Sequence, residues 1–125
     1  MTEKKKTVLV VDDDVPILDI MAQTLEEAGF RVLKAENGVR GLSLALTKNP
    51  DLILLDIIMP KMDGLTMLSK LRANKRGKKT PVIILTNLND MESAAEVMKK
   101  GVHDFLVKTD WKLADVVKKV KEKLS

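Results

Sequence analysis

The chain has 125 residues, of which 45% are apolar and 32% charged, a balance that fits one globular domain and excludes a disordered segment. It contains no cysteine, which excludes disulfides, thiolate catalysis and cysteine metal sites, and no apolar run approaches the roughly 20 residues of a membrane span. The net charge of +4 comes from lysine and arginine clusters that we interpret as solvated surface rather than a nucleic-acid site, because aromatic residues make up only 2%.

Five short runs of apolar and β-branched residues predict strands, and the segments between them have the apolar spacing of helices. The predicted strands are Thr7–Val11, Arg31–Ala35, Leu52–Asp56, Val82–Thr86 and Asp104–Val107. The predicted helices are Pro16–Ala28, Val39–Lys48, Leu65–Asn74, Met91–Lys100 and Lys112–Leu124. This alternation is typical of an α/β domain in which a parallel sheet is covered by helices on both faces.

Capping residues mark the ends of several predicted helices. Asp14 stands before Pro16, which suits a first helical turn, and Gly29 follows the first helix as a stop signal. Asn37 and Asn89 can cap the second and fourth helices. On the last helix, lysines face away from an apolar stripe made of Leu113, Val117, Val120 and Leu124.

The distribution of charge predicts the order of the strands. The runs Val8–Val11, Leu52–Leu55 and Val82–Leu85 are apolar throughout, which places the first, third and fourth strands in the centre. The second and fifth strands carry charged residues, which places them at the edges. Right-handed crossovers then give a flavodoxin-like, doubly wound sheet of order 2-1-3-4-5. Ligands of such sheets bind at the carboxyl ends of the strands, beside the switch point between strands 1 and 3.

Carboxylates are placed at that switch point. Asp12 and Asp13 follow the first strand, and Asp56 ends the third. Parallel neighbouring strands bring these carboxylates together, and like charges at short range are costly unless a cation neutralises them. Asp14 is interpreted as the cap of the first helix rather than as a metal ligand.

Four separated sequence elements resemble those of response-regulator receiver domains of two-component signalling. They are Val10–Asp14, Leu55–Asp56 with Met59–Gly64, Ile84–Thr86, and Phe105–Lys108. The resemblance extends over essentially the whole chain and implies a single receiver domain over residues 1–125, with no output domain in this chain. It also implies a cytoplasmic regulatory protein rather than an enzyme.

The resemblance assigns a role to each carboxylate of the site. Asp56 is the implied phosphoacceptor, which receives a phosphoryl group from a sensor histidine kinase or a histidine phosphotransfer protein. The implied Mg²⁺ ligands are Asp13, Asp56 and the backbone carbonyl of Ile58, while Asp12 acts largely through water. Oxygen ligands of this kind suit Mg²⁺.

Three further residues are implied to respond to the phosphoryl group. The hydroxyl of Thr86 hydrogen-bonds it, the ammonium of Lys108 pairs with it, and Phe105 rotates as Thr86 moves. The resemblance thus predicts a signal relayed to a downstream protein through the surface of helix 4, strand 5 and helix 5. On that surface Trp111 is read either as a partner anchor or as a lid over the helix end. Neither direct nucleic-acid binding nor a membrane contact is expected, and homodimerisation is left open.

The sequence departs from the family pattern at several positions near the site. Thr109 replaces the usual proline, so we expect a trans Lys108–Thr109 bond, since the cis form would cost about 2.5–4 kcal/mol. Asn87 stands where a small residue is usual and narrows access to the phosphoryl group. Ile58 and Leu88 are apolar at positions that flank the path of hydrolytic water, which predicts a slowly hydrolysing acyl phosphate.

Three alternative functions compete with this prediction. A receiver-like interaction module that no longer depends on phosphorylation is the main one, and Asn87 and Thr109 keep it open. A haloacid-dehalogenase-like phosphatase needs a second aspartate two residues after Asp56, where Ile58 stands. A flavodoxin-like FMN carrier is disfavoured because Asp12–Asp14 would repel phosphate.

Overall fold

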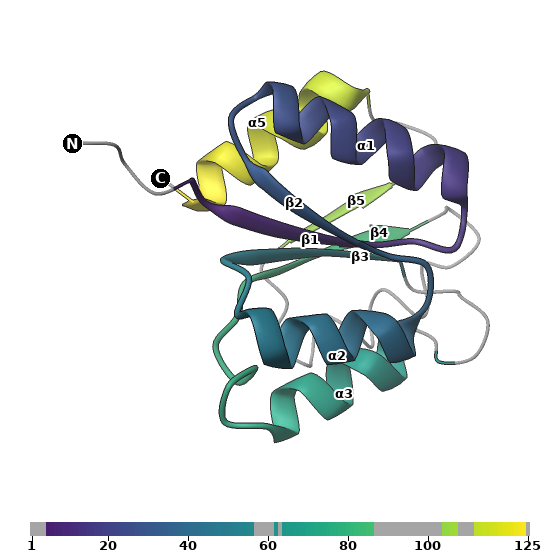
Figure 1. Ribbon diagram of the computed structural model, residues 1–125, viewed down its shortest axis with the longest axis vertical. Coiled ribbons are helices and arrows are strands. Elements are labelled where there is room, and N and C mark those ends of the chain that lie inside the picture. The colour runs from purple at the N-terminus through teal and green to yellow at the C-terminus, as the bar shows by residue number, and fades with distance from the viewer. Residues whose placement is uncertain (1–4, 57–61, 63, 87–103, 108–111, 125) are drawn as a thin grey trace.

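A parallel sheet forms the centre of the molecule in the computed structural model, which describes residues 5–56, 62, 64–86, 104–107 and 112–124. The strand order is β2-β1-β3-β4-β5 (Figure 1). The parallel architecture and the order of the first four strands are confirmed, and β5 lies beside β4 as predicted. The strands are β1 (Thr7–Val11), β2 (Arg31–Ala35), β3 (Leu52–Asp56), β4 (Val82–Thr86) and β5 (Asp104–Val107).

Helices cover both faces of this sheet. In Figure 1, α1 and α5 lie on one face, and α2 and α3 lie on the other. Each begins or ends close to its predicted position, and the predicted helix Met91–Lys100 lies outside the described residues. The helices are α1 (Val15–Glu27), α2 (Gly38–Lys48), α3 (Gly64–Ala73) and α5 (Leu113–Leu124).

The alternation of side chains along β1 divides the core into two clusters. Val8 and Val10 face α1 and α5, whereas Leu9 and Val11 face α2 and α3. All four are fully buried, as are residues 52–55 of β3. Helices cover both faces of these central strands, and the strands are therefore apolar throughout.

The apolar stripe of α5 differs from the predicted one. Val116 and Val120 are its buried residues, whereas Leu113, Val117 and Leu124 are only partly buried. The prediction omitted Val116, which lies one turn before Val120 on the same face. Val117 and Leu124 pack at the margin of the cluster rather than in its centre.

The predicted capping residues of α1 and α2 are confirmed. The carboxylate of Asp14 accepts from the N–H of Ile17, and the side chain of Asn37 accepts from the N–H of Arg40. Helix α1 ends in a Schellman motif, with Gly29 at φ 101°. Asn89 lies outside the described residues.

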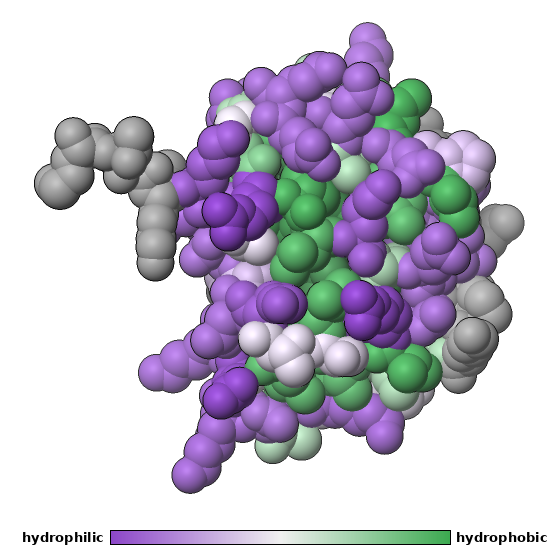
Figure 2. All heavy atoms as spheres, viewed as in Figure 1, coloured by the Kyte–Doolittle hydropathy of each residue, from purple (hydrophilic) through white to green (hydrophobic). Residues whose placement is uncertain are grey.

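The face of the molecule shown in Figure 2 is largely hydrophilic, with an apolar strip between α1 and α2 where the edge strand β2 lies. Val32 and Leu33 of this strand are partly buried, and its charged residues Arg31 and Lys34 are exposed. Exposed charges on an edge strand disfavour pairing with another sheet. Among the helices described, none is long and apolar enough to cross a membrane.

Candidate functional site

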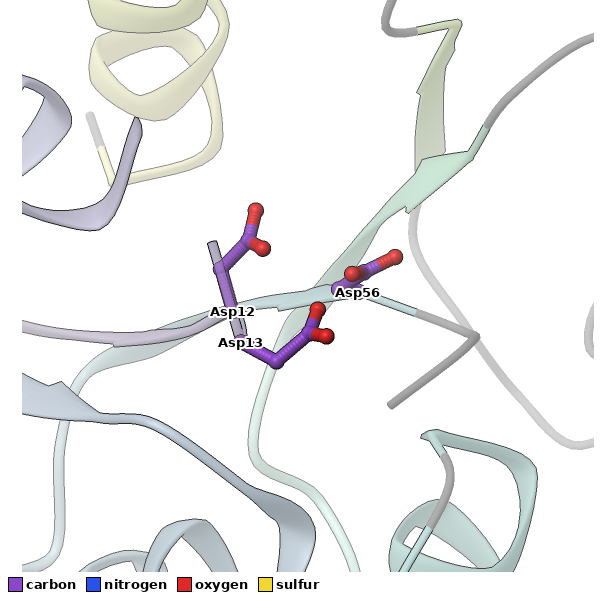
Figure 3. A group of neighbouring side chains, drawn as sticks. All are labelled: Asp12, Asp13 and Asp56. Carbon is purple, nitrogen blue, oxygen red and sulfur yellow. The ribbon is translucent and has the colours of Figure 1, made fainter. Parts of the chain in front are cut away.

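The predicted acidic residues meet at the carboxyl ends of β1 and β3 (Figure 3). Val11 pairs with Leu55 in the sheet, so Asp12 and Asp56 follow directly at the ends of neighbouring strands. Each of Asp12, Asp13 and Asp56 offers a carboxylate oxygen, and these atoms lie within 4.8 Å of one another. We call these three residues the acidic group. Its formation confirms that the carboxylates converge, as the strand order predicted.

Backbone hydrogen bonds hold the segment that carries two of these carboxylates. The N–H of Asp12 donates to the carbonyl of Ala35 at 3.1 Å, which continues the β1–β2 pairing past the end of the strand. The N–H of Asp14 donates to Oδ1 of Asp12 at 3.0 Å. Asp14 itself caps α1, so its carboxylate serves the helix, as the sequence predicted.

The three carboxylates differ in their exposure to solvent. Asp12 is fully buried and Asp56 is 5% exposed, whereas Asp13 is exposed. Two buried carboxylates beside a third carry repulsion that a bound cation would remove. The amino terminus of α1 starts just after this segment, and its partial positive charge adds to the neutralisation.

The donor set fits a hard divalent cation. All three side chains offer oxygen, which Ca²⁺ and Mg²⁺ prefer, and Mg²⁺ binds proteins through one or two carboxylates while it keeps several waters. The exposed position of Asp13 leaves one side of the group open to water. The chain has no cysteine and a single histidine, so cysteine-thiolate and multi-histidine metal sites are excluded.

The other predicted site residues are placed only in part. Thr86 ends β4, one residue past Leu85, which pairs with Asp56. Its backbone therefore lies at the same edge of the sheet as the acidic group. Phe105 pairs with Ile84 within the sheet. The other residues discussed from the sequence near the site lie outside the described residues: Ile58, Asn87, Leu88, Lys108, Thr109 and Trp111.

Two glycines of α2 near this edge were not singled out from the sequence. Gly38 and Gly41 are both buried. A Cβ on Gly38 would overlap the backbone of Met62, and a Cβ on Gly41 would lie 2.9 Å from Val11 Cγ2. The only sequence signal for them is their place in the first turn after the cap Asn37, which does not reveal such contacts.

The sequence as a whole matches a family model described as "Response regulator receiver domain" over residues 8–121. The chain belongs to this family. Receiver domains of response regulators are regulatory modules, which agrees with the prediction of a regulatory protein. The predicted resemblance is thereby confirmed.

Curated relatives include a longer protein, the DNA-binding dual master transcriptional regulator RpaA of Synechocystis sp. It is 39% identical over 101 residues, which cover 81% of this chain and 42% of the relative. The chain thus spans less than half the length of that relative.

Solved structures share the same architecture. The chemotaxis protein CheY4 of Vibrio cholerae matches with a TM-score of 0.87 at 29% identity, covering 95% of this chain and 98% of the other. The receiver domain of the sensor histidine kinase PA1611 from Pseudomonas aeruginosa matches with a TM-score of 0.85 at 26% identity, covering 95% and 97%. That structure is described as having a magnesium ion coordinated in its active site cleft.

Proposed function

We propose that this domain is a Mg²⁺-dependent signalling switch that accepts a phosphoryl group on Asp56. The observation that carries the proposal is the acidic group, whose carboxylate oxygens lie within 4.8 Å of one another at the switch point of a receiver-domain fold. The donor would be the phosphohistidine of a sensor histidine kinase or of a histidine phosphotransfer protein. The absence of cysteine agrees with a cytoplasmic location for this exchange.

The transfer itself requires positioning and charge neutralisation more than covalent assistance. A carboxylate oxygen of Asp56 forms the new bond to phosphorus, and the bond from phosphorus to the histidine nitrogen breaks, leaving its electron pair on that nitrogen. Asp13 and Asp56 would hold Mg²⁺ directly, with the backbone carbonyl of Ile58 as a further proposed ligand, and Asp12 would act largely through water. The bound ion would neutralise charge on the phosphoryl oxygens. Hydrolysis of the acyl phosphate would then return Asp56 to its free form.

Three residues are proposed to respond to the new group. The hydroxyl of Thr86 would hydrogen-bond a phosphoryl oxygen, and the Lys108 ammonium would pair with it as a point charge. Phe105 would rotate as Thr86 moves, and the change would reach the surface formed by strand 5 and the flanking helices. Support for Thr86 is the strand register, which puts its backbone beside the end of β3.

Phosphorylation by a small donor tests this proposal directly. The protein is incubated with Mg²⁺ and acetyl phosphate, and its intact mass is measured. We expect the wild-type protein to gain the mass of one phosphoryl group and Asp56→Asn to gain none. A wild-type protein that gains no mass would instead support the phosphorylation-independent interaction module. An Asp56→Asn variant that is modified as readily as the wild type would place the acceptor elsewhere.

The lifetime of the acyl phosphate provides a second test. The apolar residues Ile58 and Leu88 cannot orient a water molecule for attack, so hydrolysis is expected to be slow. We expect the double variant Ile58→Asn, Leu88→Glu to lose its phosphoryl group faster than the wild type. Equal rates in a dephosphorylation time course would contradict this expectation.

A further inference from the structure

The first turn of α2 contacts chain segments from both sides of the acidic group. Ala35, just before this turn, accepts from the N–H of Asp12. Gly41 faces Val11, the residue before Asp12: a Cβ there would lie 2.9 and 3.0 Å from the two Val11 methyl groups and 3.0 Å from Met67 Sδ. The helix therefore approaches the end of β1 as closely as it does because position 41 has no side chain.

Gly38 makes a second close approach, to Met62, which follows Asp56 by six residues. A Cβ on Gly38 would overlap the carbonyl oxygen of Met62 and lie 2.9 Å from Met62 Cβ and 3.0 Å from its carbonyl carbon. Two of these three atoms are backbone, which cannot rotate away as a side-chain end can. Met62 belongs to the connection that begins after Asp56 and ends at α3, and its side chain packs against the core cluster beneath α2 and α3.

We propose that Gly38 is a positioning residue for the cation held by the acidic group. The missing side chain sets how closely Met62 approaches α2, while Gly41 of the same turn faces Val11 at the end of β1. The turn therefore contacts Val11, directly before Asp12, and Met62, six residues after Asp56, and through these two contacts it is proposed to set the spacing of the carboxylates. This inference rests on the proposed cation site but not on phosphoryl transfer.

An added methyl group at position 38 must displace either the Met62 backbone or α2. Mg²⁺ demands near-ideal octahedral geometry with ligands at about 2.0–2.1 Å, so small displacements of the ligand-bearing segments weaken binding. We expect Gly38→Ala to raise the dissociation constant for Mg²⁺ about fivefold or more, since misplacements near 1 Å can cost about 100-fold in function. Phosphorylation by acetyl phosphate should slow at limiting Mg²⁺ and recover when Mg²⁺ is saturating.

Gly77 provides a matched control at the opposite edge of the sheet. It is also buried, and a Cβ there would overlap the Leu71 side chain and lie 2.6 Å from the Leu71 carbonyl oxygen. Gly77→Ala therefore introduces the same kind of backbone clash far from the acidic group. We expect it to lower the urea midpoint as Gly38→Ala does while leaving the Mg²⁺ dissociation constant within about twofold of the wild-type value, because the two sites share no partners.

The wild type, Gly38→Ala and Gly77→Ala are compared by calorimetric titration with MgCl₂, by urea unfolding and by phosphorylation with acetyl phosphate. A Gly38→Ala variant that binds Mg²⁺ as tightly as the wild type overturns the inference, as does a Gly77→Ala variant that is weakened equally. If the wild type does not bind Mg²⁺, the inference is also wrong. If the wild type binds Mg²⁺ but takes no phosphoryl group, the proposed function fails. The Mg²⁺ dissociation constants of Gly38→Ala and Gly77→Ala, each relative to the wild type, then decide the role of Gly38.

A second pair of variants decides the question if Gly38→Ala does not fold. Met62→Ala keeps the Cβ that faces Gly38, whereas Met62→Gly removes it, and neither adds an atom to the contact. We expect Met62→Gly to bind Mg²⁺ at least about twofold more weakly than Met62→Ala, in keeping with the coupling of neighbouring residues. Equal affinities would contradict a positioning contact at this point.

Discussion

The backbone N–H of Asp14 donates to Oδ1 of Asp12, and the main chain that starts α1 thereby fixes the most deeply buried carboxylate of the acidic group. The N–H of Asp14 precedes the helix. The N–H of Ile17, in the first helical turn, donates instead to the Asp14 carboxylate. The two aspartates are thus one unit: the first faces the site, and the second caps the helix that positions it.

Asparagine at position 12 distinguishes the contribution of the Asp14 N–H hydrogen bond from that of the Asp12 negative charge. The amide oxygen of Asp12→Asn still accepts from the Asp14 N–H, but one buried negative charge is removed. Without Mg²⁺ we expect the free energy of unfolding to rise by about 1 kcal/mol, a typical single-site effect, because repulsion within the acidic group falls. Urea unfolding in EDTA measures this change, and a variant less stable than the wild type would contradict it.

Saturating Mg²⁺ should make the wild type more stable than Asp12→Asn, the reverse of their order in EDTA. At a Mg²⁺ concentration 100 times the dissociation constant, wild-type stability should rise by about 2.7 kcal/mol. Asp12→Asn should gain much less at the same concentration. Asp13→Asn is the control: Asp13 is exposed, so its loss should weaken the response to Mg²⁺ with little change in EDTA.

Loss of the Asp14 side chain should affect α1 rather than the cation site. Asp14→Ala removes the acceptor for the Ile17 N–H and should lower the free energy of unfolding by about 1 kcal/mol. Asp14→Asn keeps an oxygen acceptor for the Ile17 N–H, so its free energy of unfolding should fall by less than that of Asp14→Ala. The Asp14 N–H remains in both variants, so the Mg²⁺ dissociation constant should change little. A loss of Mg²⁺ binding as large as that of Asp13→Asn would instead make Asp14 a ligand.

The convergence of Asp12 and Asp56 was predictable because it follows from strand order. Two apolar runs identified central strands, and a carboxylate follows each at the same edge. The different burial of Asp12 and Asp13 was not predictable, since it depends on how the chain turns between β1 and α1. The approach of Gly38 to Met62 joins a helix residue to a residue of the connection before α3, and a residue pattern within one segment carries no sign of such a contact. Val116 was missed for a similar reason, because its burial comes from packing against residues of α1 and the sheet.

Asn49 ends α2 in the left-handed region, at φ 48° and ψ 59°. Side chains with a Cβ disfavour this region by roughly 1–2 kcal/mol, and asparagine tolerates it better than most. We expect Asn49→Ala to lower the free energy of unfolding by about 1 kcal/mol and Asn49→Gly to stay within about 0.5 kcal/mol of the wild type, because the relief of strain is offset by greater freedom in the unfolded chain. Urea unfolding checks both, and Ser43→Ala, on an exposed part of the same helix, serves as the control. An alanine variant as stable as the glycine variant would contradict the assignment of strain.

Asp51 closes the edge of the sheet opposite the acidic group. Its Oδ2 accepts from the Thr7 N–H at 2.7 Å, and its own N–H donates to the Thr7 carbonyl at 2.8 Å, so the starts of β1 and β3 are joined by two bonds. Asp51→Ala leaves the Thr7 N–H without that carboxylate and should lower the free energy of unfolding by about 1.5–3 kcal/mol, the range for hydrogen bonds to charged groups.

Asp51→Asn tests whether the charge or the acceptor matters. The amide oxygen can still accept from Thr7, so we expect less than half of the loss seen with alanine. Both variants should bind Mg²⁺ as the wild type does, because the residue lies at the far end of β3 from Asp56. Urea unfolding and Mg²⁺ titration of the two variants measure these effects. If the asparagine variant is as unstable as the alanine variant, the stabilisation comes from the negative charge of Asp51 rather than from its hydrogen bond.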